Sequence, residues 1–156
     1  MKKLILIVLT LLSFVIAATG QITTEIHPAI EYQHHSGEQV AAVGGDFNLN
    51  AGNVLELYTG YRIGRTERKR LHQEFRIGAV GNLEYWDKLH FTGGFEYLQR
   101  YYVHSVEGRK NSFWQDSFRY LAGFKWIGDR YTIQVLGYLQ PDEVGFTLRF
   151  NYRIII

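Results

Sequence analysis

The sequence predicts an all-β fold, an eight-stranded antiparallel up-and-down transmembrane β-barrel. Three observations predict it. Apolar and polar residues alternate with a period of two along most of the chain, turn-forming residues divide the chain into eight such segments, and aromatic residues gather near the segment ends. A pleated strand places successive side chains on opposite faces, so this alternation separates an apolar face from a polar one. A closed barrel with its apolar face outward fits a membrane.

The first four strands follow from this alternation. The first two, about 29–36 and 39–50, are the weakest, because few large apolar residues recur in them. The third and fourth are clearer, and their apolar faces are Leu55, Leu57, Tyr61 and Ile63, then Phe75, Ile77, Ala79, Leu83 and Tyr85. Because proline cannot donate to a closed ladder, we expect Pro28 at or before the start of the first strand.

The last four strands are the better defined half of the pattern. The fifth carries Leu89, Phe91, Phe95 and Tyr97 on one face, and the sixth carries Phe118, Tyr120, Phe124 and Trp126. The seventh runs over 130–140. In the eighth, every second residue is apolar: Val144, Phe146, Leu148, Phe150, Tyr152 and Ile154. Helical spacing would scatter these residues around an axis, so a strand is the better prediction.

The connections fall into two alternating classes. Tight turns are expected at 50–53, 86–88 and 128–129. The others are 34–38, 64–74, 106–117 and 140–142, and the two longest belong to this second class. Short periplasmic turns and longer outer loops are the layout of outer-membrane barrels.

Residues 1–20 have the pattern of a cleaved secretory signal peptide. Lys2 and Lys3 precede an apolar run from Leu4 to Ala18, and small residues follow it. This run is shorter than the roughly 20 residues that a spanning helix needs. We therefore expect an exported mature chain, residues 21–156, that forms the barrel.

Composition excludes several other classes of protein. The chain has 156 residues, no Cys and a formal net charge of +2. The length fits one domain, and the balanced charge predicts no nucleic-acid partner. Without thiols there is no disulfide, no Cys-ligated zinc and no cysteine nucleophile. No cofactor is expected.

A soluble periplasmic lipocalin-like binding barrel is the alternative fold, because it also alternates but places its apolar side chains inside. Aromatic residues near strand ends, such as Trp86 and Trp126, favour the membrane arrangement, in which they form interfacial girdles. Small residues on the apolar face, such as Gly81 and Gly93, would leave voids in a small packed core.

The polar face then lines the barrel interior. Eight strands enclose only enough room for side chains, and charges shut away from water must be paired. We therefore predict a charged, plugged interior and not a pore. The expected salt-bridge network is Glu31, Glu56, Arg62, Arg76, Glu84, Glu96, Arg100, Arg119, Lys125, Arg149 and Arg153, with Asp46 and Glu143 on the same face.

Signal peptide, eight alternating segments, tight turns and charged lumen together resemble the small OmpA/OmpX-like outer-membrane barrels. The Tyr-rich, Cys-free composition is similar to the small barrels of Bacteroidota. This resemblance of pattern covers the mature chain, although the C-terminal residues 150–156 do not end on the aromatic residue that closes many such proteins. It implies a protein of the Gram-negative outer membrane with a non-enzymatic structural or adhesion role, or an accessory subunit of a larger outer-membrane complex.

An enzymatic alternative rests on two residues near the outer end. Some small barrels modify lipid A as acyl hydrolases or transferases, and His34 and Ser36 have the residue types of a base and a nucleophile. His72 and His104 fall at the same end. Polar loop residues are the simpler interpretation, because no third orienting residue is identifiable. The histidines lack the spacing of known metal motifs, so no metal site is expected.

A basic cluster in the two longest loops suggests a lipid partner. Arg and Lys hold phosphates by charge-assisted hydrogen bonds, and lipopolysaccharide supplies the nearest anions outside an outer membrane. Solvated loop charge explains the same residues equally well. The residues expected to contact lipopolysaccharide are Arg65, Arg68, Lys69, Arg70, Arg109 and Lys110.

Overall fold

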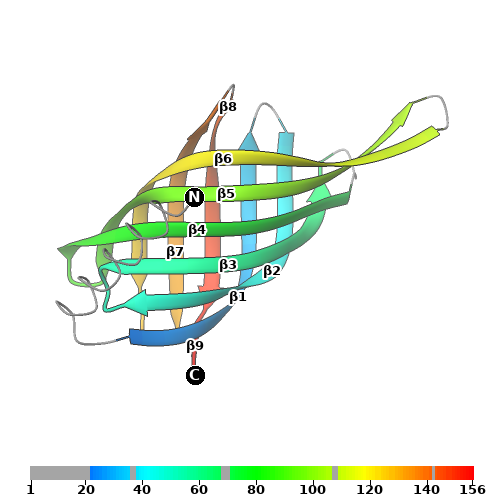
Figure 1. Ribbon diagram of the computed structural model, residues 1–156. Coiled ribbons are helices and arrows are strands. Elements are labelled where there is room, and N and C mark those ends of the chain that lie inside the picture. Colours follow the sequence, from blue (N-terminus) through cyan, green and yellow to red (C-terminus); the bar gives the residue numbers. More distant parts are fainter. Residues whose placement is uncertain (1–21, 36–37, 68–70, 107–108, 142) are drawn as a thin grey trace, which may run out of the picture.

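The computed structural model describes residues 22–35, 38–67, 71–106, 109–141 and 143–156 (Figure 1). The expected signal peptide lies outside these ranges. The strands are β1 (Ile22–His35), β2 (Glu38–Ala51), β3 (Leu55–Thr66), β4 (Leu71–Trp86), β5 (Leu89–Val106), β6 (Arg109–Ile127), β7 (Tyr131–Gln140), β8 (Glu143–Tyr152) and β9 (Ile154–Ile155).

These strands form one closed antiparallel sheet. Its order is β2-β3-β4-β5-β6-β7-β8-β1, and β1 also pairs with β2, which closes the barrel. The short β9 follows β8 after Arg153 and pairs with β1. The predicted eight-stranded up-and-down barrel is therefore confirmed, with β9 as a continuation of the eighth strand.

The two ends of the barrel differ in their connections. The turns β2–β3, β4–β5 and β6–β7 lie at one end, called here the turn end, and the other four connections lie at the opposite loop end. Two of the tight turns contain a residue with positive φ, Gly52 at 56° and Asp87 at 43°. Such φ values suit Gly and Asp in reversals of the chain, and they explain why these turns are short.

The two loops predicted to be longest are largely strand. β3 reaches Thr66, β4 begins at Leu71, and β5 and β6 stay paired as far as Val106 opposite Arg109. In Figure 1 the end of this β5–β6 hairpin projects beyond the barrel wall. The alternation fades there because a projecting hairpin has solvent on both faces, so neither face needs to be apolar.

Pro28 lies inside β1, opposite Gly45 of β2, and not at or before the start of the strand. On its other side the ladder is interrupted. Ala29 pairs with Asn151 of β8, and pairing resumes only at Ile26 with Ile154 of β9. A missing N–H donor is tolerated at such a break, which is why the first strand can begin at Ile22.

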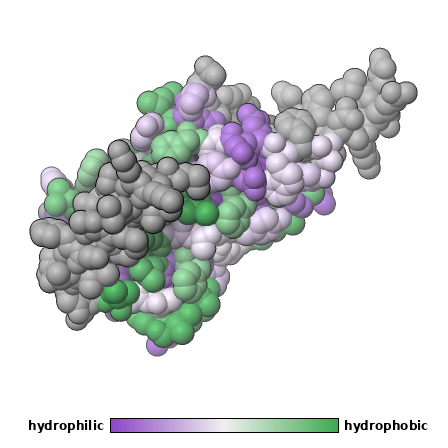
Figure 2. Space-filling model, viewed as in Figure 1, coloured by the Kyte–Doolittle hydropathy of each residue, from purple (hydrophilic) through white to green (hydrophobic). Residues whose placement is uncertain are grey.

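Apolar side chains face outward and charged ones inward. Phe124 and Val135 are 51% and 52% exposed, whereas the side chains of Arg62, Arg76 and Arg119 are completely buried. This is the reverse of a soluble lipocalin-like barrel. Figure 2 shows hydrophobic side chains over the lower part of the visible face and a hydrophilic patch over β5 and β6 beside the projection. Within the described residues, no helix is long and apolar enough to cross a membrane.

Candidate functional site: a charged interior and a projecting hairpin

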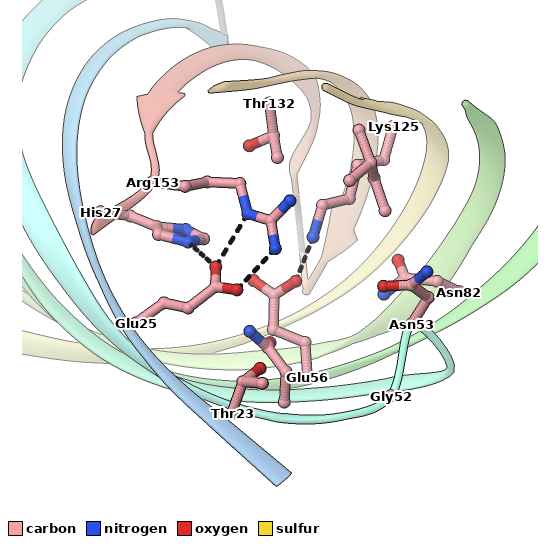
Figure 3. Close-up of a pocket in the computed structure, with 12 residues that line it drawn as sticks. Thr23, Glu25, His27, Gly52, Asn53, Glu56, Asn82, Lys125, Thr132 and Arg153 are labelled. Atoms are coloured by element: carbon pink, nitrogen blue, oxygen red, sulfur yellow. Dashed lines mark hydrogen bonds and ion pairs between the residues drawn. The ribbon is translucent and has the colours of Figure 1, made fainter. Parts of the chain in front are cut away.

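Ionic side chains fill the barrel in three layers along its axis. Inward positions of the alternating strands supply every member, because residues i and i+2 share a face. The loop-end layer is centred on Glu74, the turn-end layer on Glu25 and Glu56 (Figure 3), and a larger middle layer lies between them. The middle layer consists of Glu31, Asp46, Arg62, Arg76, Glu96, Arg119 and Arg149.

Glu31 of β1 forms ion pairs with three arginines in the middle layer, and two of them, Arg62 and Arg76, also donate hydrogen bonds to it. Its Oε2 lies 3.1 Å from Arg62 Nε and 2.6 Å from Arg76 Nη1, and its Oε1 lies 3.1 Å from Arg149 Nε. Thr147 and Gln33 donate to the same carboxylate, at 2.8 and 3.0 Å. Both oxygens of this fully buried carboxylate thus accept hydrogen bonds and lie beside arginines, which is the condition for tolerating such a charge.

Asp46 and Glu96 complete the middle layer from opposite walls. Arg62 Nη2 lies 2.5 Å from Asp46 Oδ2, and Arg76 holds both oxygens of Asp46 at 3.1 Å. Glu96 accepts from Arg149 Nη2 at 2.9 Å and from Arg119 Nε. Four guanidiniums therefore share three carboxylates across strands β1 to β8.

In the turn-end layer, two ion pairs lie side by side (Figure 3). Arg153 forms a bidentate pair with Glu25, at 2.6 and 3.0 Å, and Lys125 pairs with Glu56. His27 links the two pairs, since it lies 2.6 Å from Glu25 and 2.9 Å from Asn48, whose amide donates to Glu56 at 2.7 Å.

The loop-end layer is smaller. Arg100 Nε donates to Glu74 at 2.8 Å, His72 lies 3.7 Å from the same carboxylate, and Gln33 reaches it at 3.4 Å. Gln33 also donates to Glu31. It therefore connects the loop-end layer to the middle layer.

Little open space remains among these side chains. A polar cavity of about 30 Å³ opens at the turn end between Glu25, Glu56 and Lys125, and another of about 10 Å³ lies deeper, next to Tyr58 and Arg149. A water molecule needs roughly 10–15 Å³ of such space. Both cavities are small, and the charged side chains of the middle layer are almost completely buried, so the predicted plugged interior is observed.

Ten of the eleven side chains expected in the network line the interior. Glu84 does not, because it is exposed next to an irregularity at the turn end of β4. Arg153 is the most accessible of the others, at 18%. Glu25 and Glu74 also belong to the network, although the alternation does not predict them: Glu25 precedes the predicted first strand, and Glu74 ends the predicted connection 64–74. The available sequence signal was their spacing. Glu25 is separated by an even number of positions from His27 and Glu31, so all three share one face of the strand.

The two described histidines of the catalytic hypothesis face opposite sides of the wall. The ring of His34 stacks on that of Phe146 on the outer surface, with centroids 5.5 Å apart. His72 is buried in the lumen. His34 and His72 therefore do not come together, although both lie near the loop end. Ser36 lies outside the described residues, and the side chain of His104 is not described.

Of the predicted lipid-contacting residues, Arg65 is described completely. It is exposed near the loop end of β3. Arg68, Lys69 and Arg70 lie outside the described residues, and for Arg109 and Lys110 only the backbone of β6 is described. Among the described residues, no group of three or more His, Cys, Asp and Glu side chains is placed to hold a metal ion.

The β5–β6 projection has an open edge. β7 pairs with β6 only from Tyr120 onward, and β4 pairs with β5 only as far as Tyr101. In the described part of the chain, Arg109 to Arg119 of β6 therefore have a strand neighbour on one side only. Tyr101 and Trp114 pack at the base of the projection, with centroids 5.1 Å apart.

Comparisons with known proteins place the fold. No protein-family model and no curated protein matches the chain. The N-terminal β-barrel domain of Pseudomonas aeruginosa OprF is similar in structure, with a TM-score of 0.65 at 10% identity, over 86% of this chain and 100% of that one. Neisserial surface protein A has a TM-score of 0.54 at 8% identity, over 85% and 97%.

A de novo designed transmembrane β-barrel is also similar, with a TM-score of 0.54 at 10% identity, over 84% of this chain and 95% of that one. At these identities the likeness concerns the fold alone. Fold, outward apolar wall and buried ionic interior together define a small eight-stranded β-barrel of the outer-membrane type.

Proposed function

We propose that this chain is a non-enzymatic protein of the Gram-negative outer membrane that attaches to extended polypeptide outside the cell. The open edge of β6 in the projecting hairpin is the observation that carries this proposal. An unpaired strand edge offers a row of N–H and C=O groups, and an extended peptide can add to it as a further strand.

The interior and the wall support an attachment role over transport or catalysis. The middle layer fills the lumen with paired charges, which suits a rigid support for the hairpin. His34 and His72 cannot act together, because they lie on opposite sides of the wall. A lipid A hydrolase that uses His34 and Ser36 is the weaker alternative, because no third residue that would orient the histidine is identifiable. Similarity to small barrels of Bacteroidota stays a prediction from the sequence.

Peptide binding to the refolded barrel in detergent tests the proposal. The probe is a fluorescent ten-residue peptide of alternating Thr and Val, and its fluorescence anisotropy is measured against barrel concentration. We expect saturable binding that disappears when every second amide is N-methylated on the pairing side, because a methylated amide cannot donate. The peptide methylated on its other side is the matched control and should bind like the unmodified one.

Proline substitutions locate the binding edge. Neighbouring residues of a strand direct their N–H groups to opposite sides, so one of Gln115→Pro and Asp116→Pro removes a donor from the open edge and the other removes one from the β5 ladder. We expect the edge-facing proline to abolish peptide binding while the barrel still shifts its gel mobility on boiling. Equal binding by the wild type and both variants would contradict the proposal.

A further inference from the structure

A second feature of the molecule lies on its outer wall, away from the hairpin edge. An apolar groove of about 440 Å³, the wall groove, crosses strands β2 to β6. It follows the pairing, because Phe47 of β2 lies opposite Thr59 of β3, and Thr59 lies opposite Ile77 of β4. The wall groove therefore runs across the strands, oblique to the barrel axis.

Side-chain size explains why the wall is hollow here. Thr59 and Ala79 are small and only partly exposed, and they form the floor. Phe47 stands at one end, and at the other Phe95 and Phe118 stack with centroids 5.6 Å apart. Large rings around small floor residues leave a channel rather than an even surface.

The dimensions of the wall groove fit a hydrocarbon chain better than a protein. An α-helix is about 10 Å across, so 440 Å³ would accommodate roughly one turn of it. A second barrel would present a convex wall, which cannot enter a narrow channel. One acyl chain is thinner than a helix and can lie along the whole groove.

Arg65 supplies a positive charge, and its distance from the wall groove matches half the hydrocarbon thickness of a bilayer. It is exposed on the outer face of β3, six residues toward the loop end from Thr59. Six residues of strand span about 20 Å, and a strand tilt of roughly 40° reduces this to about 15 Å along the membrane normal. Half the hydrocarbon thickness of a bilayer is also about 15 Å. With Thr59 at the bilayer midplane, a lipid whose acyl chain reaches the wall groove from the outer leaflet brings its headgroup level with Arg65.

The surroundings of Arg65 leave its guanidinium available to an anion. Its cross-strand neighbours are Ala41 of β2 and Leu71 of β4, neither of which is charged. No ion pair to Arg65 occurs within the described ranges of the chain. Guanidinium binds phosphate through paired, charge-assisted hydrogen bonds.

We infer that the wall groove and Arg65 together form a binding site for one molecule of lipid A, with an acyl chain across Thr59 and Ala79 and a phosphate on Arg65. The loop end faces the outside under the proposed function, and this inference rests on that orientation. It does not require the open hairpin edge to bind peptide.

Lipid retention measured by native mass spectrometry tests the inference. The purified barrel is mixed with equal amounts of lipid A, lipid A without phosphates, or phosphatidylglycerol. We expect one lipid A to be retained, at least fivefold less of the dephosphorylated form, and at least fivefold less phosphatidylglycerol. Arg65→Gln should lower retention of lipid A to the level of the dephosphorylated form.

Matched variants separate the groove from general effects on the wall. Thr59→Phe should fill the floor and lower lipid A retention at least fivefold. Ala122→Leu enlarges another small outward residue, on β6 outside the wall groove, and should leave retention unchanged, as should Arg130→Gln at the turn end. Gel mobility before and after boiling confirms that each variant is folded.

Two results would overturn the inference. One is retention of lipid A and phosphatidylglycerol to the same extent. The other is unchanged retention in the folded Thr59→Phe and Arg65→Gln variants. Either result leaves the attachment proposal standing, because peptide binding at the hairpin edge is measured separately in detergent without lipid A.

Discussion

Tyr58 of β3 lies directly opposite Gly78 of β4, and its ring occupies the space that a side chain on Gly78 would need. The Tyr58 hydroxyl donates to Glu96 at 2.8 Å, which ties the ring to the middle layer. The same arrangement recurs where Tyr138 of β7 lies opposite Gly145 of β8. Glycine thus makes room in the wall for each large inward ring.

Gly78→Ala should therefore destabilise the barrel by about 1–3 kcal/mol, the usual cost of forcing an extra methyl into a packed site. A Cβ at Gly78 would overlap the buried ring of Tyr58 and displace its hydroxyl from Glu96. Urea unfolding of the refolded barrel in lipid vesicles measures the change.

Gly93→Ala is the control for this prediction, because a Cβ there would have its nearest neighbour, Leu121 O, at an ordinary 3.6 Å. It should change the free energy of unfolding little. Combining Gly78→Ala with Tyr58→Leu should cost less than the sum of the two single changes, since the shorter side chain removes the overlap. Equal losses from Gly78→Ala and Gly93→Ala would argue against the proposed packing.

The excess of arginine in the middle layer predicts an asymmetry between removing an acid and removing a base. Glu96→Gln would leave four guanidiniums with two carboxylates, and breaking buried pairs in this way costs about 3–5 kcal/mol. Arg119→Met would leave three guanidiniums with three carboxylates. Arg119 makes one bond, to Glu96, and its Nη1 and Nη2 have no hydrogen-bond partner among the described residues.

We therefore expect Glu96→Gln to lower the urea midpoint clearly more than Arg119→Met does. Some loss in Arg119→Met is still expected, because its guanidinium lies 4.7 Å from the ring centroid of Tyr138. Thermal midpoints of the gel-mobility shift give an independent measure. A larger loss for the arginine variant would mean that the middle layer is short of positive charge and not of negative charge.

The alternation of the sequence predicted the fold and most of the interior because lipid and lumen impose opposite demands on successive residues. It failed where those demands stop. Glu74 lies near the loop end, within a segment predicted as a connection. Glu84 is on the interior side of the alternation but is exposed at the turn end. Pro28 was misplaced because the break in the ladder of β1 arises from β8 and β9, which are distant in sequence.

The sequence also could not predict which of the buried charged residues form ion pairs with one another. Glu31 forms ion pairs with Arg62, Arg76 and Arg149, which come from three different strands. Alternation gives the face of each residue, but the stagger between strands decides which of them meet. That stagger follows from the closure of the whole barrel.

The filled middle layer predicts that the barrel conducts no ions. Reconstituted into a planar bilayer at 1 M KCl, a condition chosen to magnify any leak, the wild-type protein should give no discrete current steps. Lys125→Met widens only the cavity at the turn end, so this variant should stay silent as well. Regular current steps in the wild type would show that the middle layer opens.

Arg153 should act as a clasp where the chain closes on itself. It holds Glu25 of β1 through two bonds, its Nη1 donates to Gly128 O at 3.1 Å, and its backbone N donates to Arg130 O at 2.7 Å. It thereby joins the first strand, the β6–β7 turn and the end of β8. Because its side chain is 18% exposed, solvent weakens the pair, and we expect Arg153→Met to cost about 1–2 kcal/mol.

Lysine at this position should rescue only part of the loss, since an ammonium cannot reproduce the two-pronged contact with Glu25 or reach Gly128 at the same time. Arg130→Met is the matched control, because that exposed arginine contributes its backbone carbonyl and not its side chain to the clasp. Unfolding in urea ranks the variants. We expect the wild type and Arg130→Met to be the most stable, followed by Arg153→Lys and then Arg153→Met. If Arg153→Lys were as stable as the wild type, the positive charge alone would be sufficient to close the barrel.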